Sequence, residues 1–149
     1  MNSPSVIVVK QVSPAEVYPL RHKVLRPNQS LAACVWAQDT DPDTAHFAAV
    51  LNAQIVGIAS IAICPREGDS PNTWRLRGMA TEPELQGQGI GARVLAKCLE
   101  HAKSRDGTLI WCNARTSALE FYRKYGFETI GDEFETPGIG PHFVMVRPL

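Results

Sequence analysis

Apolar residues recur at helical spacing in the middle of the chain, directly after a stretch that alternates like a strand. Residues 90–102 place apolar side chains three and four positions apart with charged residues between them, which predicts an amphipathic helix. Residues 74–80 alternate between two sides, which predicts a strand. One side of this strand would carry Leu76, Gly78 and Ala80, and the other Arg75, Arg77 and Met79. The apolar helix face would consist of Ile90, Val94, Leu95, Cys98, Leu99 and Ala102.

Shorter patterns predict the remaining elements. Ser13, followed by Pro14 and by Glu16 three positions on, has the form of a capping box that starts a helix. Pro19 would remove a hydrogen bond from that helix, so we expect an irregular or restarted helix. Strands around two or three helices predict a mixed α/β sheet. The other expected elements are a first strand at 6–9, a hairpin of 46–51 with 55–64, a long connection at 26–42 suited to a lid, a strand at 108–112 and a last strand at 143–146.

The loop between the strand and the helix carries the clearest chemistry. It reads Gln86-Gly87-Gln88-Gly89-Ile90-Gly91, and glycines at 87, 89 and 91 allow φ > 0 and a close approach of the backbone to a ligand. A helix that starts at such a loop points unpaired amides and the positive end of its dipole at whatever fills it. The loop therefore predicts a binding site for a phosphate chain, against the alternative of a glycine-rich turn that binds nothing.

Three kinds of phosphate loop were compared with this pattern. A Walker loop ends in Gly-Lys-Ser/Thr, which is absent. Gly87-x-Gly89-x-x-Ala92 matches a variant of the dinucleotide fingerprint, but that fold expects an acidic residue at the end of the next strand, where Asn113 stands. Read as Gln86-x-x-Gly89-x-Gly91 after residues 79–85, the loop resembles motif A of the GNAT superfamily of acyl-CoA-dependent N-acyltransferases.

A second segment strengthens this resemblance. Asn113-Ala114-Arg115, then Ala118 and the run from Phe121 to Phe127, is similar to motif B of the same superfamily, with a strand-end Asn, a helical Phe-Tyr and a closing Gly-Phe. The two motifs have the expected order and separation, and together they cover residues 74–130. The C-terminal segment 134–145 and Leu20-Arg21 resemble a group of small bacterial GNAT proteins of largely unassigned substrate.

The resemblance implies a fold and a cofactor site. The fold is a mixed, mostly antiparallel central sheet flanked by helices and splayed at the cofactor site, in a single domain of residues 1–149. Strand amides near Met79, Ala80 and Thr81 would bind pantetheine and the acyl oxygen, and the loop would bind the pyrophosphate. Asn113 and Ser117 would lie near the pantetheine arm, although Asn113 could instead cap the next helix. The loop residues concerned are Gln86, Gly87, Gln88, Gly89, Ile90 and Gly91.

Candidate catalytic residues follow from the chemistry of amine attack on a thioester. Tyr122 holds the motif position where the family often places a phenol near the thioester sulfur, so it is the candidate general acid, against the alternative of a plain core tyrosine. Arg77 stands where relatives often carry a glutamate base. Its planar fork suits a substrate carboxylate or phosphate, although an internal ion pair is the alternative. The remaining candidate bases are His46, His142 and Glu82.

Composition narrows the partners. The chain has 149 residues and is 44% hydrophobic, which is enough for one core. Its 15 basic and 15 acidic residues balance, so charge gives no case for nucleic acid or membrane as partners. No long apolar run or signal-peptide pattern is present, and the four cysteines lack a C-x-x-C pair. We therefore expect a cytoplasmic protein with reduced thiols and no metal.

These observations predict an acetyl-CoA-dependent N-acetyltransferase. The acceptor would be a small-molecule primary amine or a peptide N-terminus, attacking directly in a ternary complex. The resemblance also makes a homodimer a reasonable expectation. Two alternatives stay open: a catalytically silent acyl-CoA-binding sensor, favoured by the missing acidic residue on the central strand, and a dinucleotide-binding domain.

Overall fold

Across residues 6–149, which the computed structural model describes, seven strands form one sheet in the order β1-β2-β3-β4-β5-β7-β6. Every neighbouring pair is antiparallel except β4 and β5, which are parallel. The predicted mixed, mostly antiparallel sheet is therefore confirmed. The strands are β1 (Val8–Val12), β2 (Ala45–Leu51), β3 (Gln54–Ile63), β4 (Thr73–Thr81), β5 (Leu109–Arg115), β6 (Glu128–Thr136) and β7 (Gly140–Pro148).

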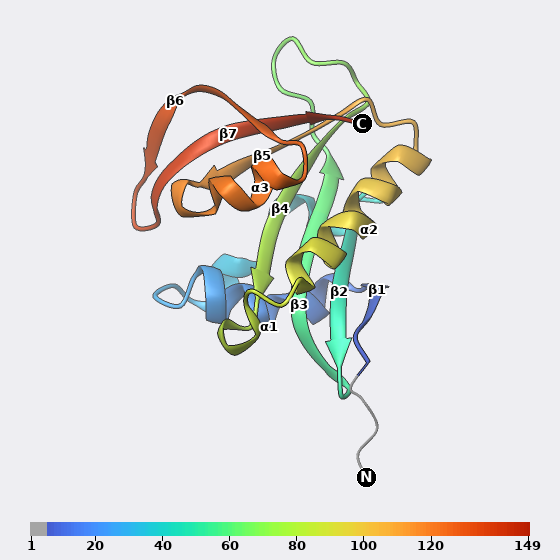
Figure 1. Cartoon of the computed structure of the whole chain (residues 1–149), viewed down its shortest axis with the longest axis vertical. Helices are drawn as coiled ribbons and strands as arrows, with labels where there is room; N and C mark the ends of the chain where they lie inside the picture. The colour runs from blue at the N-terminus through green and yellow to red at the C-terminus, as the bar shows by residue number, and fades with distance from the viewer. Residues whose placement is uncertain (1–5) are drawn as a thin grey trace.

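Helices cover both faces of the sheet (Figure 1). The long helix α2 (Ile90–Ser104) buries the predicted apolar stripe in the larger core, together with Trp74 and Leu76 of β4. Helix α1 (Pro14–Leu20) packs a smaller core on the opposite face, with Ile58 and Ala80. The third helix, α3 (Leu119–Lys124), follows β5. Within the described residues, no helix is long and apolar enough to cross a membrane.

The central strands separate toward one end of the sheet. β4 pairs with β5 only through Thr73–Arg75, although β4 continues to Thr81 and β5 continues to Arg115. Beyond Arg75 the two strands diverge, and Figure 1 shows β5, β6 and β7 angled away from the lower part of β4. Alternate backbone groups of residues 77–81 therefore face a gap instead of a neighbouring strand.

A β-bulge in β4 overturns the predicted alternation of this strand. Arg77 pairs with Ser60 and Ala80 with Ile58, so two β4 residues stand opposite the single residue Ala59. Gly78 accommodates the bulge at φ +65°. The prediction that Leu76 and Ala80 share a face is therefore wrong, because the extra residue sends Leu76 into the larger core and Ala80 into the smaller one.

Several boundaries differ from those expected. The first strand begins two residues late, at Val8, and the capping box starts α1 as predicted. The disturbance at Pro19 is followed by a turn of π-helix, η1 (Arg21–Leu25). The connection at 26–42 contains two short 3₁₀ segments, η2 (Leu31–Cys34) and η3 (Ala37–Thr40), and two more flank the site as η4 (Pro83–Leu85) and η5 (Thr116–Ala118).

The C-terminal hairpin is longer than its sequence indicates. β6 and β7 each span nine residues, and their register shifts between Ile130 and Phe134. The sequence predicted only a short last strand at 143–146 here. Pairing of β7 with both β5 and β6 supplies the hydrogen bonds that local propensity does not predict.

Candidate active site

A cleft of about 470 Å³ opens where β4 and β5 separate. The end of β4, the glycine loop and the start of α2 form one wall, and η5 and α3 form the other. The cleft thus brings together residues from both predicted motifs. Of the expected cofactor residues it is lined by Met79, Ala80, Thr81, Gln86, Gly87, Gly89, Ile90, Gly91, Ser117 and Tyr122.

The glycine loop is shaped as an anion cradle. Gly87 and Gly89 both adopt φ +82°, where a side chain would be strained, and a Cβ at either position would point into open space. Gly89 caps α2, and the Arg93 amide donates to the Gly89 carbonyl at 3.2 Å, as the first helical hydrogen bond of an α-helix does. The amides of the first turn before Arg93 are therefore free to bind a ligand.

Two loop residues differ from the others in backbone angle or position. Gly91 does not adopt φ > 0, because it already lies in α2; a Cβ there would sit 3.5 Å from the Phe121 ring. Gln88 is exposed and does not line the cleft. Gln86 does close the loop through its side chain, since its Nε2 donates to the Thr81 carbonyl at 3.3 Å.

Tyr122 lies at the inner end of the cleft. Its side chain packs edge-on against Phe121 and Phe127, with ring centroids 5.2 and 5.4 Å away. Burial, with the neighbouring thiols of Cys112 and Cys98, raises the pKa of the Tyr122 phenol well above its usual range. The hydroxyl is therefore protonated at neutral pH.

A second cavity, of about 250 Å³, adjoins the cleft. It lies between β4 and β5, with η1, the Trp36 segment and the β6–β7 hairpin around it. Met79, Ala118 and Tyr122 line both spaces, so Tyr122 stands at their junction. Arg77 and Asn113 also line this second cavity. Asn113 is thus placed on its wall instead of in the cofactor cleft.

His142 also lines the second cavity. Its Nδ1 lies 2.8 Å from the Gly140 carbonyl, which can only accept, so Nδ1 carries the proton. In the neutral ring Nε2 is then left as a proton acceptor. Stacking on Phe134, with ring centroids 5.7 Å apart, fixes the plane of the imidazole. Among the predicted bases, His142 is the one that the fold places on the wall of this cavity.

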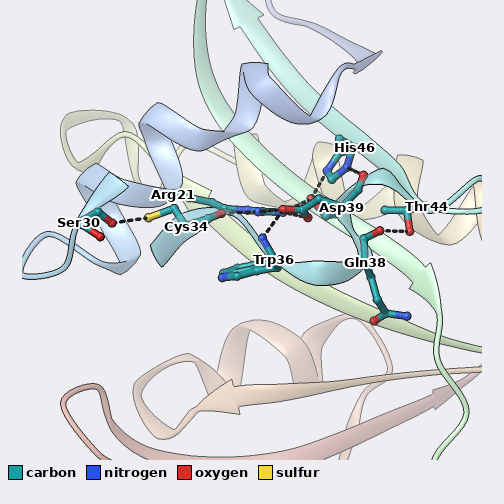
Figure 2. Close-up of polar contacts among 9 residues, drawn as sticks. Arg21, Ser30, Cys34, Trp36, Gln38, Asp39, Thr44 and His46 are labelled. Carbon is teal, nitrogen blue, oxygen red and sulfur yellow. Dashed lines mark hydrogen bonds and ion pairs between the residues drawn. The ribbon is translucent and has the colours of Figure 1, made fainter. Parts of the chain in front are cut away.

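The other two candidate bases lie elsewhere. His46 belongs to a buried network in which its Nε2 donates to the Asp39 carbonyl at 2.9 Å and its Nδ1 accepts from Ser60 at 2.6 Å (Figure 2). Burial lowers the pKa of the His46 ring, and both nitrogens are occupied. Glu82 pairs with Lys23 at 2.6 Å outside both cavities. The structure therefore brings neither side chain to the site.

Several lining residues were not found from the sequence. Trp36 comes from the long 26–42 connection, and Arg75 comes from a strand whose register with β5 only the fold defines. The lid expected in that connection was the one signal that pointed toward Trp36. Within residues 6–149, no group of three or more His, Cys, Asp or Glu side chains is arranged to hold a metal ion.

A splayed sheet with a glycine cradle at its opening defines the fold class of the GNAT N-acyltransferases. The match to known proteins agrees: residues 9–147 fit the family model described as an acetyltransferase (GNAT) domain. The chain belongs to the GNAT acetyltransferase family, and this membership makes it an acetyl-CoA-dependent acyltransferase. The dinucleotide-binding alternative is wrong, because that fold requires a mostly parallel sheet.

Three relatives illustrate the similarity. The chain is 34% identical over 148 residues to the uncharacterized N-acetyltransferase YitI of Bacillus subtilis, covering 97% of each chain. The ribosomal-protein-S18-alanine N-acetyltransferase of Escherichia coli superposes with a TM-score of 0.76 at 16% identity, covering 96% of this chain and 94% of that one. An aminoglycoside 6'-N-acetyltransferase complexed with coenzyme A superposes with a TM-score of 0.76 at 15% identity. That match covers 95% of this chain and 96% of the other.

Proposed function

We propose that this protein transfers an acetyl group from acetyl-CoA to a primary amine by direct attack in a ternary complex. The observation that carries this proposal is the meeting of two cavities at Tyr122. One cavity has a glycine cradle for a phosphate chain, and the other has polar side chains for an acceptor. Two substrates bound in these spaces would meet without any covalent intermediate on the protein.

The cleft fits the donor. The positive φ of Gly87 and Gly89 and the free amides at the start of α2 suit the pyrophosphate. The β4 edge that faces the gap, at Met79, Ala80 and Thr81, offers amides to the pantetheine arm and to the acyl oxygen. Ser117, on the opposite wall, lies within the same cleft. When bound, acetyl-CoA supplies an acetyl group activated as a thioester.

Tyr122 and His142 divide the proton transfers. Neutral His142 accepts a proton from the attacking amine at Nε2, either directly or through a water molecule. A C–N bond forms as the C–S bond breaks, and Tyr122 donates its phenolic proton to the departing sulfur. Amides of β4 stabilise the charge that develops on the carbonyl oxygen. Each of the two proton transfers therefore has its own side chain.

The acceptor enters through the second cavity. We propose Arg77 as a substrate-binding residue there, since Arg77 lines the space and its guanidinium forms no ion pair within residues 6–149. The four cysteines are free, and three of them are buried, in line with action in the reducing cytoplasm.

A pair of glycine substitutions tests this function. Gly89→Glu places a side chain in the cradle, so we expect micromolar binding of acetyl-CoA to the wild type and its loss in the variant, measured by titration calorimetry. Gly68→Glu is the matched control, because Gly68 has a similar φ of +85°, equally open surroundings and a position outside the cleft. Retained binding in Gly89→Glu would overturn the loop assignment. Binding by the wild type without transfer to any amine in a broad panel would instead establish the silent sensor.

A further inference from the structure

The second cavity, called the acceptor cavity from here on, is lined by arginine residues and by no acidic residue among those described. Four arginines border it: Arg26 and Arg115 near η1, and Arg75 and Arg77 on β4. Among the described residues, no aspartate or glutamate lines the same space. A cavity of about 250 Å³ lined by four arginine residues carries a positive potential.

Aromatic rings hold two of these guanidinium groups in place without neutralising them. The guanidinium carbon of Arg77 lies 4.0 Å from the centroid of the Trp36 ring. The guanidinium carbon of Arg75 lies 4.7 Å from the centroid of the Trp111 ring. Stacking of this kind leaves the N–H edges of the fork available. These edges are the donors that a planar oxyanion would bind.

The nearby carboxylate of Asp39 compensates this charge only in part. Asp39 receives two short hydrogen bonds from Arg21, at 2.8 and 2.9 Å, so that pair is neutral as a unit (Figure 2). The pKa of the Arg77 guanidinium falls to about 10, chiefly through burial and then through the charges of Arg75, Arg21 and Arg26, and the charge of Asp39 offsets this fall only in part. An anion in the cavity would relieve this repulsion.

We propose that the acceptor is a small primary amine that also carries an oxyanion, a carboxylate or a phosphate, which the guanidinium groups of Arg75 and Arg77 bind. This proposal rests on the acyl-transfer function proposed above. The cavity is smaller than the roughly 300–1,000 Å³ typical of pockets for drug-sized ligands, so the acceptor has few atoms beyond its amine and its anion. A polyamine would be repelled. The remaining positive charge also favours the neutral, nucleophilic form of the amine.

Matched acceptor pairs test the proposal. Phosphoethanolamine is compared with ethanolamine, glutamate with its dimethyl ester, and spermidine serves as the polycation, with free CoA release as the readout. We expect kcat/KM for the anionic member to exceed that of its neutral partner by about tenfold or more, the effect of one charge-assisted contact. The two pairs distinguish phosphate from carboxylate. Equal or faster turnover of the neutral amines or of spermidine would overturn the proposal.

Anion binding is measured separately from turnover. Inorganic phosphate and succinate are titrated into wild type, Arg77→Gln, Arg77→Lys and the control Arg66→Gln, followed by thermal shift and calorimetry. Arg66 also lies over Trp111, at 5.4 Å, but it pairs with Asp69 and does not line the cavity. We expect affinity to fall about tenfold or more in Arg77→Gln, partly to recover in Arg77→Lys, and to persist in Arg66→Gln.

The two assays separate the proposals. Anion binding that depends on Arg77, in a protein that transfers acetyl to nothing, would refute the transfer function and leave the oxyanion site standing. Turnover of amines with no dependence on Arg77 in either assay would refute the oxyanion site alone. Should Arg77→Gln fail to fold, the Arg77→Lys comparison still decides, because unchanged anion affinity and acceptor preference there would contradict a planar, forked contact.

Discussion

The buried ion pair between Arg21 and Asp39 tests how Trp36, on the wall of the acceptor cavity, is kept in position. Arg21 is fully buried, and its guanidinium donates to both Asp39 oxygens and to the carbonyl of Cys34. Asp39 also accepts from the Trp36 amide at 2.7 Å. Figure 2 shows the Trp36 ring beneath the Arg21 side chain. The guanidinium carbon of Arg21 lies 3.7 Å from the centroid of the Trp36 ring. This network therefore positions the tryptophan that packs on Arg77.

The substitution Asp39→Asn keeps the shape of the side chain and removes its charge. One of the two acceptor oxygens becomes an NH₂ group that faces the Arg21 donors, and a buried guanidinium loses its counterion. Breaking a buried pair in this way costs about 3–5 kcal/mol of unfolding free energy. For a chain of this size that is a fall in Tm of about 6–20 °C, at roughly 2–4 °C per kcal/mol. Thermal denaturation at pH 7 measures the fall in Tm, and urea denaturation at pH 7 measures the loss of unfolding free energy.

The effect depends on pH with a defined sign. Although burial opposes ionisation, hydrogen bonds from Arg21 and Trp36 hold the pKa of Asp39 below its ordinary value of 3.8. Because the folded pKa is depressed, the stability contributed by Asp39 is fully present above pH 3.8 and is lost as pH falls through the folded value. The difference between wild type and Asp39→Asn should therefore shrink below about pH 4.

A matched control makes the result decisive. Asp69→Asn breaks another bidentate Arg–Asp pair, formed through Nε and Nη2 of Arg66 at 2.8 and 3.0 Å, which is more exposed to solvent than the Arg21–Asp39 pair. It should lower stability much less than Asp39→Asn, because water replaces the lost partner. Equal losses in the two variants, or a loss below about 1 kcal/mol in Asp39→Asn, would refute the buried-charge argument. Asp39→Asn should also raise KM for the acceptor and leave acetyl-CoA affinity unchanged.

Two further substitutions examine the proposed chemistry. Tyr122→Phe should lower kcat by roughly 10²–10⁴-fold, the usual contribution of a general acid, with the calorimetric Kd for acetyl-CoA nearly unchanged; an unchanged rate would place the acid elsewhere. His142→Asn keeps a donor toward the Gly140 carbonyl and removes the acceptor corresponding to Nε2, so kcat should fall while the protein unfolds at close to the wild-type temperature. Turnover at the wild-type rate in that variant would remove His142 as the base.

The site could be predicted from the sequence wherever the chemistry is local. The glycine loop and the helix after it are contiguous, so the cradle and the apolar face of α2 follow from spacing alone. The prediction was wrong for Gly91, whose φ is helical, and wrong for the alternation of β4. An inserted residue such as the bulge at Gly78 depends on the pairing with β3, which no single-strand pattern records.

Long-range placement explains the remaining differences. His46 and His142 are equally plausible bases in the sequence, yet one fills its hydrogen bonds within a buried network and the other keeps a nitrogen available on a cavity wall. Glu82 follows the central strand directly, and its pairing with Lys23 depends on a contact between distant segments. Hydrogen-bond partners of this kind are set by packing.

The sequence by itself determined the family, the cofactor loop and the mixed sheet, because motifs and periodicity are properties of neighbouring residues. Only the tertiary structure decided which charges share the acceptor cavity. Arg26, Arg75 and Arg115 come from three separate segments, and the parallel pairing of β4 with β5, limited to Thr73–Arg75, opens the space between them. A chain with zero net charge thus folds with a strongly cationic cavity, because folding brings arginines together while their acidic counterparts lie elsewhere.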